Sequence, residues 1–205
     1  TKNSKMKKIF LCIFIILMLS NLEAEAQNLL SECKGNNKSI SKFSFKHFMM
    51  IKKWTNCQGV GLGPKGGKYV GEFYKGKFHG HGVFTKDGRK YIGQYKNHKR
   101  HGHGSYEYAN GDKYVGQWSK HKYYGEGIYT YFNGGRYIGE WKKKKYNYPD
   151  DLTERYGTGT YIYINGDKYI GKWKDGLKHG KGIFIYHTGE IEKGIWKKDK
   201  LDKLK

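Results

Sequence analysis

The sequence predicts an all-β protein made of tandem β-hairpins, and its repeats and composition are the reasons. A motif Tyr-[Val/Ile]-Gly-x-aromatic occurs five times, and each copy is followed by Gly-x-Gly. Of 205 residues, 30 are glycine and 19 are tyrosine, which is typical of short strands joined by tight turns. Only 37% of residues are hydrophobic, which excludes a multi-span membrane protein. The formal charge is +22, yet the 17% aromatic content excludes a disordered basic tail.

Residues 1–26 have the pattern of a secretory signal peptide. Lys5, Lys7 and Lys8 form a basic start before an apolar run from Ile9 to Leu19, and Ala24 and Ala26 place small residues where a signal peptidase reads. The run is too short to span a bilayer, which needs about 20 residues. We expect cleavage after Ala26 and an exported protein, periplasmic or secreted. The alternative is an uncleaved N-terminal anchor.

Residues 27–53 are expected to form a linker and cap before the repeats. The exported chain keeps two cysteines, Cys33 and Cys57, and this predicts one disulfide. Such a bridge would hold the segment over the first hairpin, whose open edge would otherwise invite aggregation. The alternative is two free thiols.

The repeat array covers residues 54–205. Its tyrosines are spaced by 22, 23, 23 and 32 residues, and partial repeats stand at each end. In the fourth repeat Gly-x-Gly begins 20 residues after the tyrosine instead of 11, so this repeat holds nine extra residues. The whole repeats begin at Tyr69, Tyr91, Tyr114, Tyr137 and Tyr169.

Each repeat is predicted to be one hairpin with glycines and aromatic residues on the same face. The period of two places Tyr114, Gly116 and Trp118 on one side of the first strand. A glycine leaves a gap on the strand surface that a ring of the neighbouring strand can cover. Asn-Gly pairs such as Asn110-Gly111 favour tight hairpin turns. We expect structural roles, with the tryptophans packed against glycines of adjacent strands, for Gly71, Gly116, Trp118, Trp141, Gly171 and Trp173.

The repeat unit resembles the MORN repeat (membrane occupation and recognition nexus) over roughly residues 54 to 200. Cys33-Lys34-Gly35 and the segment 54–59 resemble the N-terminal cap of exported bacterial members. The resemblance implies an elongated, twisted antiparallel sheet that serves as a binding or dimerising platform. It departs from the usual repeat in the enlarged fourth copy and in Phe73 and Tyr95, which replace tryptophan.

The loops between the two strands of each repeat are rich in lysine, including Lys96, Lys99 and Arg100. Stacked hairpins would place neighbouring loops about 9.6 Å apart, near the Debye length, so their positive fields would add. This edge is a candidate site for anionic lipid headgroups, an envelope polymer or an acidic protein. Nucleic acid is ranked below these. The alternative is a solvated rim that keeps an open sheet soluble.

Neither catalysis nor a metal site is expected from the sequence. No triad spacing is visible, and Gly-x-Gly lacks the following helix that a phosphate loop needs. His79-Gly80-His81 and His101-Gly102-His103 could face a metal, but other repeats hold different residues at these positions. We therefore expect a non-enzymatic binding or scaffold protein without cofactor, with a protein partner or self-association, or alternatively a module binding anionic phospholipid.

The nine extra residues of the fourth repeat give a second candidate site. Insertions in repeat proteins often lie on the binding face. The alternative is a neutral surface insertion. The candidate contact residues here are Lys142, Lys143, Lys144, Lys145, Tyr146 and Tyr148.

Overall fold

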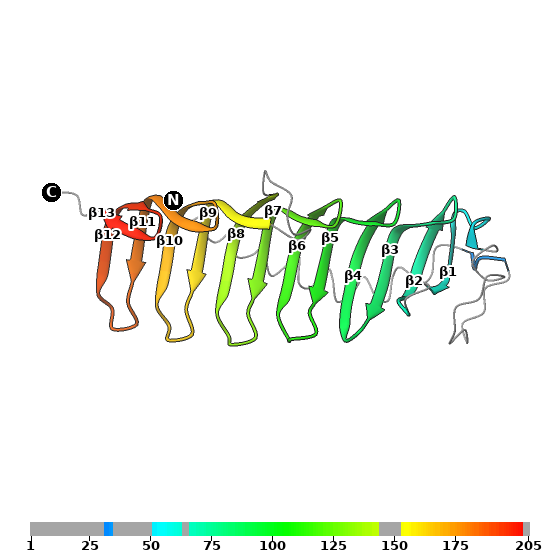
Figure 1. Cartoon of the computed structure of the whole chain (residues 1–205), viewed down its shortest axis with the longest axis horizontal. Helices are drawn as coiled ribbons and strands as arrows, with labels where there is room; N and C mark the ends of the chain where they lie inside the picture. The colour runs from blue at the N-terminus through cyan, green and yellow to red at the C-terminus, as the bar shows by residue number, and fades with distance from the viewer. Residues whose placement is uncertain (1–30, 35–50, 63–65, 144–152, 203–205) are drawn as a thin grey trace. The chain divides into compact units, whose positions relative to one another are not determined.

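The computed structural model describes residues 31–34, 51–62, 66–143 and 153–202 (Figure 1). The predicted signal peptide and most of the enlarged loop, including Lys144, Lys145, Tyr146 and Tyr148, lie outside these residues. Within residues 57–96 and within residues 99–202, each described strand pairs antiparallel with its neighbours in chain order, which confirms the all-β fold class and the tandem hairpins. Within the described part of the chain, no helix is both long and apolar enough to cross a membrane.

The chain divides into two compact units, 1–99 and 100–205. Unit 1 contains the strands β1 (Cys57–Leu62), β2 (Lys68–Tyr74), β3 (Lys77–Lys86) and β4 (Arg89–Lys96). Unit 2 contains β5 (Lys99–Glu107), which starts at the boundary, and then β6 (Lys113–Ser119), β7 (Lys122–Thr130), β8 (Arg136–Lys143), β9 (Thr153–Ile162), β10 (Lys168–Lys174), β11 (Leu177–Ile185), β12 (Ile191–Lys197) and β13 (Lys200–Asp202).

The Gly-x-Gly motif forms a β-bulge in the second strand of a hairpin. The register of β6 and β7 shifts between Gly116 and Trp118, and Gly125 lies opposite this shift with φ of 60°. The same shift and the same left-handed glycine recur where β10 pairs with β11, at Gly180. A bulge bends its strand and increases the local twist. The first glycine of the motif is therefore required by backbone conformation.

The core of each unit is a layer of buried rings on one face of the sheet. The tyrosine that starts each repeat is fully buried, at 0% exposure. In unit 2 the Tyr114 hydroxyl donates to the Gln117 carbonyl at 3.0 Å, and Trp118 Nε1 donates to the Gly104 carbonyl at 3.0 Å. Trp141 and Trp173 reach the carbonyls of Gly127 and Gly159 in the same way. The buried Nε1 atoms of these three tryptophans are thus paired with backbone carbonyls, whereas Nε1 of Trp196 is buried without a hydrogen-bond partner among the described residues.

The ring that covers Gly116 and Gly127 is the repeat's own tyrosine, whereas the tryptophans are buried against glycines of the preceding strand, as expected. A Cβ added at Gly116 would lie 2.6 Å from the Tyr114 hydroxyl, and one added at Gly127 would collide with the same ring. The bulge bends the second strand so that tyrosine lies over the glycines, while tryptophan extends to the preceding strand.

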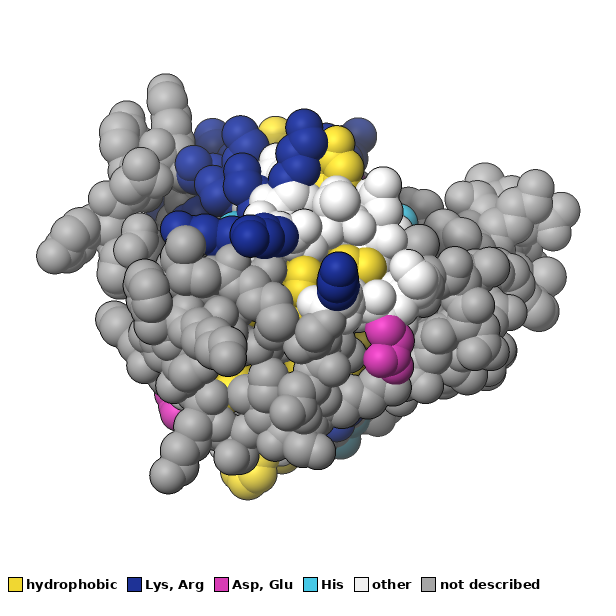
Figure 2. Space-filling model, turned by 90° about the vertical axis from the view of Figure 1, so that its right-hand side faces the viewer, with side chains coloured by type: hydrophobic (Ala, Val, Ile, Leu, Met, Phe, Trp, Pro, Cys, Tyr) yellow, Lys and Arg dark blue, Asp and Glu magenta, His cyan; other side chains and the backbone are white. Residues whose placement is uncertain are grey.

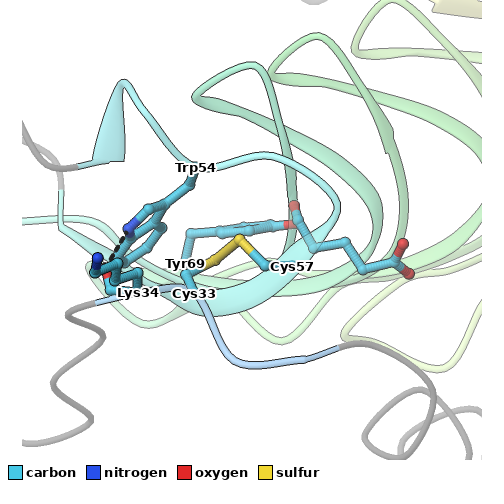
Figure 3. The surroundings of a disulfide bond; sticks show 6 residues. Cys33, Lys34, Trp54, Cys57 and Tyr69 are labelled. Atoms are coloured by element: carbon cyan, nitrogen blue, oxygen red, sulfur yellow. Dashed lines mark hydrogen bonds between the residues drawn. A yellow bond between two sulfur atoms is a disulfide. The ribbon is translucent and has the colours of Figure 1, made fainter.

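Cys33 and Cys57, the pair expected from the sequence, are joined by a disulfide with Cα atoms 5.0 Å apart (Figure 3). Cys33 N donates to the Gln58 carbonyl at 2.8 Å, so residues around Cys33 cover the outer edge of β1. Trp54 packs edge-on to Phe73 and donates Nε1 to the Lys34 carbonyl. An edge strand that would otherwise be open is thereby covered.

Candidate binding surface

A row of half-buried rings crosses unit 2 and is its most distinctive surface feature. One ring lies near the end of each of β5, β7, β9 and β11, and a second ring follows two residues later, one residue beyond the end of the strand. We call this row the aromatic stripe. Its members are Tyr106, Tyr108, Tyr129, Tyr131, Tyr161, Tyr163, Phe184 and Tyr186.

The rings of the aromatic stripe form one unbroken series of contacts. Within a pair the ring centroids are 4.5 to 4.7 Å apart. From one pair to the next they are 5.6 to 6.1 Å apart. These distances lie in the favourable range for aromatic pairs, and the rings are tilted to one another rather than stacked. The surface is therefore apolar, ribbed and partly accessible to solvent.

Three cations pack beside the aromatic stripe. Arg100 lies 4.6 Å from the Tyr106 ring centroid and 4.5 Å from that of Trp118. Arg155 lies 4.5 Å from the Trp173 centroid, and Lys178 lies 4.4 Å from the Trp196 centroid. Burial lowers the pKa of Lys178. Cation–π contact stabilises the charge at a site that is partly removed from water.

The stripe hydroxyls fall into two groups. Tyr129 donates to Asp112 Oδ2 at 2.7 Å, and Tyr186 donates to Glu192 at 2.9 Å. In contrast, no hydrogen bond is formed by the hydroxyls of Tyr131, Tyr161 and Tyr163 within the described residues. Burial raises the pKa of Tyr131 and of Tyr163, so both stay protonated at neutral pH. They are donors available to a ligand.

Backbone hydrogen bonds join the lysine-rich turns to the preceding repeat. In unit 2 the His121 N donates to the Arg100 carbonyl at 3.0 Å, and Asp199 N donates to the Lys178 carbonyl at 3.1 Å. Both central residues of these turns have positive φ, including Lys120 and His121. The turns are therefore of the type that matches strand twist, although they lack Asn-Gly.

The side chains of the predicted edge lysines Lys96, Lys99, Lys120 and Lys143 are exposed. Figure 2 shows lysine and arginine side chains gathered along the upper margin at the β1 end.

Two of the cations predicted to lie on the basic edge, Arg100 and Lys142, instead contact other side chains of the protein. The Arg100 guanidinium lies over the rings beside the aromatic stripe, because its strand position points to the same face as Tyr106. Lys142 Nζ lies 3.5 Å from the carboxylate of Glu154, which is only 7% exposed, and 3.9 Å from the Tyr156 ring centroid. The charge of Lys142 is thus locally compensated.

The histidine pairs do not form a metal site among the described residues. His81 N donates to Glu72 Oε1 at 2.7 Å, and its ring Nδ1 lies 3.4 Å from the same oxygen. Burial raises the pKa of Glu72, but the contacts from His81 outweigh this and leave the pKa below its ordinary value. A shallow pocket of about 350 Å³ lies beside this pair, and its lining includes Phe73 and His79.

The recurrence of buried tyrosine, bulged Gly-x-Gly and paired rings defines a repeating structural unit. The family model of the MORN repeat matches residues 69–88, 91–113, 114–136 and 169–191. The chain is therefore similar to the MORN repeat over these four segments. The enlarged repeat that begins at Tyr137 lies outside the matched segments, because its insertion separates the two halves of the MORN pattern.

A search of curated protein sequences gave no match to the chain. Among solved structures, the TCP domain of SAS-4 (dCPAP) of Drosophila melanogaster, in complex with a proline-rich motif of Ana2 (dSTIL), aligns at 14% identity. The alignment covers 67% of this chain and 77% of that chain with a TM-score of 0.36.

The aromatic stripe was not identified from the sequence, although its signal is present. The sequence places Tyr129 and Tyr131 on the face of the MORN glycines, and Gly-x-aromatic-x-aromatic recurs in four successive repeats. A search for this longer pattern would have found all eight rings.

Proposed function

We propose that the chain is a non-enzymatic protein-binding module whose contact surface is the aromatic stripe. MORN repeats are known as protein- and lipid-binding modules. The observation that carries the proposal is the unbroken series of eight half-buried rings in unit 2. Contiguous apolar surface rimmed by polar groups marks an interaction site, and tyrosine is enriched at such sites.

A capture experiment tests this proposal. The full chain is used as bait with extract of its source cells, beside the variants Tyr131→Ala and Tyr124→Ala. Tyr131 is central in the aromatic stripe, whereas Tyr124 is a 58% exposed tyrosine of β7 outside it, so it is the matched control. We expect the wild type and Tyr124→Ala to capture the same protein and Tyr131→Ala to lose most of it. Equal capture by all three baits would overturn the proposal.

The second candidate is binding of anionic phospholipid headgroups by the lysine-rich turns. It is favoured by exposed lysines at positions such as Lys120 and Lys143, and by a formal charge of +22. Attraction between exposed charges is screened at a Debye length of about 8 Å in physiological salt. Retention on phosphatidylserine vesicles that falls steeply with salt, and is unchanged in Tyr131→Ala, would support this function.

We also propose that the protein is exported to the periplasm or the medium. The support is the signal-like pattern of residues 1–26 together with the Cys33–Cys57 disulfide, since such bridges persist in oxidising compartments. N-terminal sequencing of the protein from its source cells tests this. We expect a mature chain that begins at Gln27. A cytoplasmic protein that retains residues 1–26 and carries Cys33 and Cys57 as free thiols would contradict export.

A further inference from the structure

The ring pairs of the aromatic stripe repeat at a regular distance, and this distance restricts the conformation of a polypeptide that can bind along the stripe. Its rings come from every second strand, so one pair follows the next after two strand spacings. Strands in a sheet are about 4.8 Å apart, which gives about 9.6 Å per pair. A polypeptide that contacts each pair alike must repeat its own surface at this distance.

Of the regular polypeptide conformations, only polyproline II fits this period. It has three residues per turn and rises about 3.1 Å per residue, so its surface repeats every 9.3 Å or so. An α-helix repeats after about 5.4 Å, and two turns overshoot the period by about 1.2 Å. A β-strand presents the same face every 6.6 Å or so. Over the three steps from β5 to β11, polyproline II drifts by about 1 Å, which is small beside a ring.

We propose that the aromatic stripe binds a proline-rich segment in the polyproline II conformation, running across the strands of unit 2. This inference rests on the proposed protein-binding function and names the class of partner. Polyproline II has no internal hydrogen bonds, so its carbonyls are free to accept. The hydroxyls of Tyr131, Tyr161 and Tyr163 supply donors that form no hydrogen bond within the described residues.

The cations beside the aromatic stripe favour an acidic residue at the third position of each polyproline II turn of the ligand. With two residues of a turn packed against the rings, the third faces the side where Arg100, Arg155 and Lys178 lie. Arg155 and Lys178 belong to successive hairpins, on β9 and β11. The equivalent position of β7 is Tyr123, so acidic side chains at every third position would meet a cation at three of the four ring pairs. The expected ligand is a repeat of the type Pro-Pro-Glu.

Calorimetric titration of the full chain with synthetic peptides tests the inference without any variant. The probe has about five Pro-Pro-Glu repeats, enough turns to pass all four ring pairs. A Gly-Ser-Glu peptide of equal length and charge lacks the conformation, and a Pro-Pro-Lys peptide reverses the charge. We expect the Pro-Pro-Glu peptide to bind at least about tenfold more tightly than either control, since a preformed conformation loses less entropy.

Variants then place the peptide on the aromatic stripe. Tyr131→Ala should weaken Pro-Pro-Glu binding by about tenfold, and Tyr124→Ala should leave it unchanged. Tyr131→Phe keeps the ring and removes the donor, so it should fall between them. Equal affinity for Pro-Pro-Glu and Gly-Ser-Glu would overturn the inference. If Tyr131→Ala nevertheless loses the natural partner, the protein-binding function stands and only the class of partner is wrong.

Discussion

At the scale of the residue, one tyrosine in each repeat takes the space of two absent side chains. Tyr114 is fully buried, its hydroxyl donates to the Gln117 carbonyl, and its ring lies over both Gly116 and Gly127. Tyr169 does the same over Gly171 and Gly182. The glycines are therefore fixed by the ring above them and not only by turn geometry.

Gly116→Val should be strongly destabilising for this reason. The new Cβ would lie 2.6 Å from both the Gly127 Cα and the Tyr114 hydroxyl, and the backbone partner cannot move aside. We expect a loss of about 1–3 kcal/mol in the free energy of unfolding. Lys113→Val, at an exposed position of the same strand, is the control and should change stability by less than about 0.5 kcal/mol. Equal melting temperatures for the two variants would refute this account.

Sequence reasoning correctly placed the tryptophans against glycines of adjacent strands, but it did not identify the tyrosine that covers Gly116 and Gly127. Alternation alone puts Tyr114, Gly116 and Trp118 on one face, which is correct. It cannot tell which ring reaches which glycine, because that depends on the bend at Gly125, where φ is 60°. A period of two contains no information about bulges.

His98 is a turn residue whose protonation should affect the stability of unit 1. Phe78 N donates to His98 Nδ1 at 3.2 Å, which requires that this nitrogen carry no proton. Burial, and then the charge of Lys77, lowers the pKa of His98. A pKa that is lower in the folded than in the unfolded state means that stability is complete above about pH 6.5 and is lost as the pH falls through the folded value.

His98→Asn should remove this part of the pH dependence. Asparagine tolerates the positive φ of 66° and offers an acceptor that does not titrate. We expect the melting temperature of the wild type to fall more between about pH 7 and pH 5 than that of the variant, because the other histidines contribute equally to both. Parallel melting curves over this range would show that His98 has no such role.

At the scale of the element, neighbouring hairpin turns are joined by an aspartate. Asp112 accepts from Phe132 N at 2.7 Å and from the Tyr129 hydroxyl, both in the next hairpin. Burial raises the pKa of Asp112, but these hydrogen bonds outweigh it and hold the pKa below its ordinary value. Asp167 accepts from His187 N in the same arrangement. The intervening turn has Gly135 at this position.

Gly135→Asp should therefore stabilise unit 2. Gly135 is not among the residues with positive φ, and a Cβ there would lie 3.1 Å from the Tyr161 hydroxyl, which forms no other hydrogen bond within the described chain. The new carboxylate can accept from this hydroxyl, which lies at the movable end of its side chain. We expect a gain of about 1 kcal/mol, measured by denaturant unfolding.

The reverse change gives the matching control. Asp112→Gly removes the same contacts from the preceding turn, and it should lower stability by a similar amount of about 1 kcal/mol. If both Gly135→Asp and Asp112→Gly lowered stability, the two turns would not be equivalent. The stabilising contact of the aspartate would then be specific to the turn that contains Asp112.

The turns also show where sequence reasoning stops at this scale. Asn-Gly pairs mark turns such as Asn110-Gly111 correctly. The two-residue turns with two positive φ angles occur instead at pairs such as Lys120-His121, which carry no such mark. There the strain is offset by a backbone hydrogen bond from His121 to the preceding repeat, a contact 21 residues away in the sequence. A local motif cannot reveal a partner at that distance.

At the scale of the whole molecule, the chain offers two surfaces of different chemistry. The repeat period produces both of them, since each hairpin adds a lysine-rich turn and a pair of rings. The candidate contact residues that the sequence suggests are mostly lysine and arginine, together with Tyr146 and Tyr148 of the insertion, because charge is visible in composition. The rings of the aromatic stripe are present in the sequence as the recurring pattern Gly-x-aromatic-x-aromatic. The pattern alone does not show that rings of successive hairpins contact one another, because that depends on the pairing of the strands.

The enlarged repeat gives a decisive deletion. Lys142 pairs with Glu154 and Lys143 with Thr153 across β8 and β9, so the ends of the insertion already lie in register. Replacing residues 144–152 by Asn-Gly should close this pair with a two-residue turn. The shorter loop costs less closure entropy, and the free energy of unfolding should rise by about 1 kcal/mol.

Partner capture by this trimmed chain separates the two candidate sites. The aromatic stripe, including Tyr131 and Tyr161, is left in place by the deletion, so we expect capture to be retained in full. The alternative is that the insertion itself forms the specific contact, and it predicts that the trimmed chain loses capture. The contact residues would then be Lys142–Lys145, Tyr146 and Tyr148. Loss of capture by a trimmed chain that melts at or above the wild-type temperature would move the site from the aromatic stripe to the insertion. Loss together with a lower melting temperature would instead show that residues 144–152 support the fold of β8 and β9.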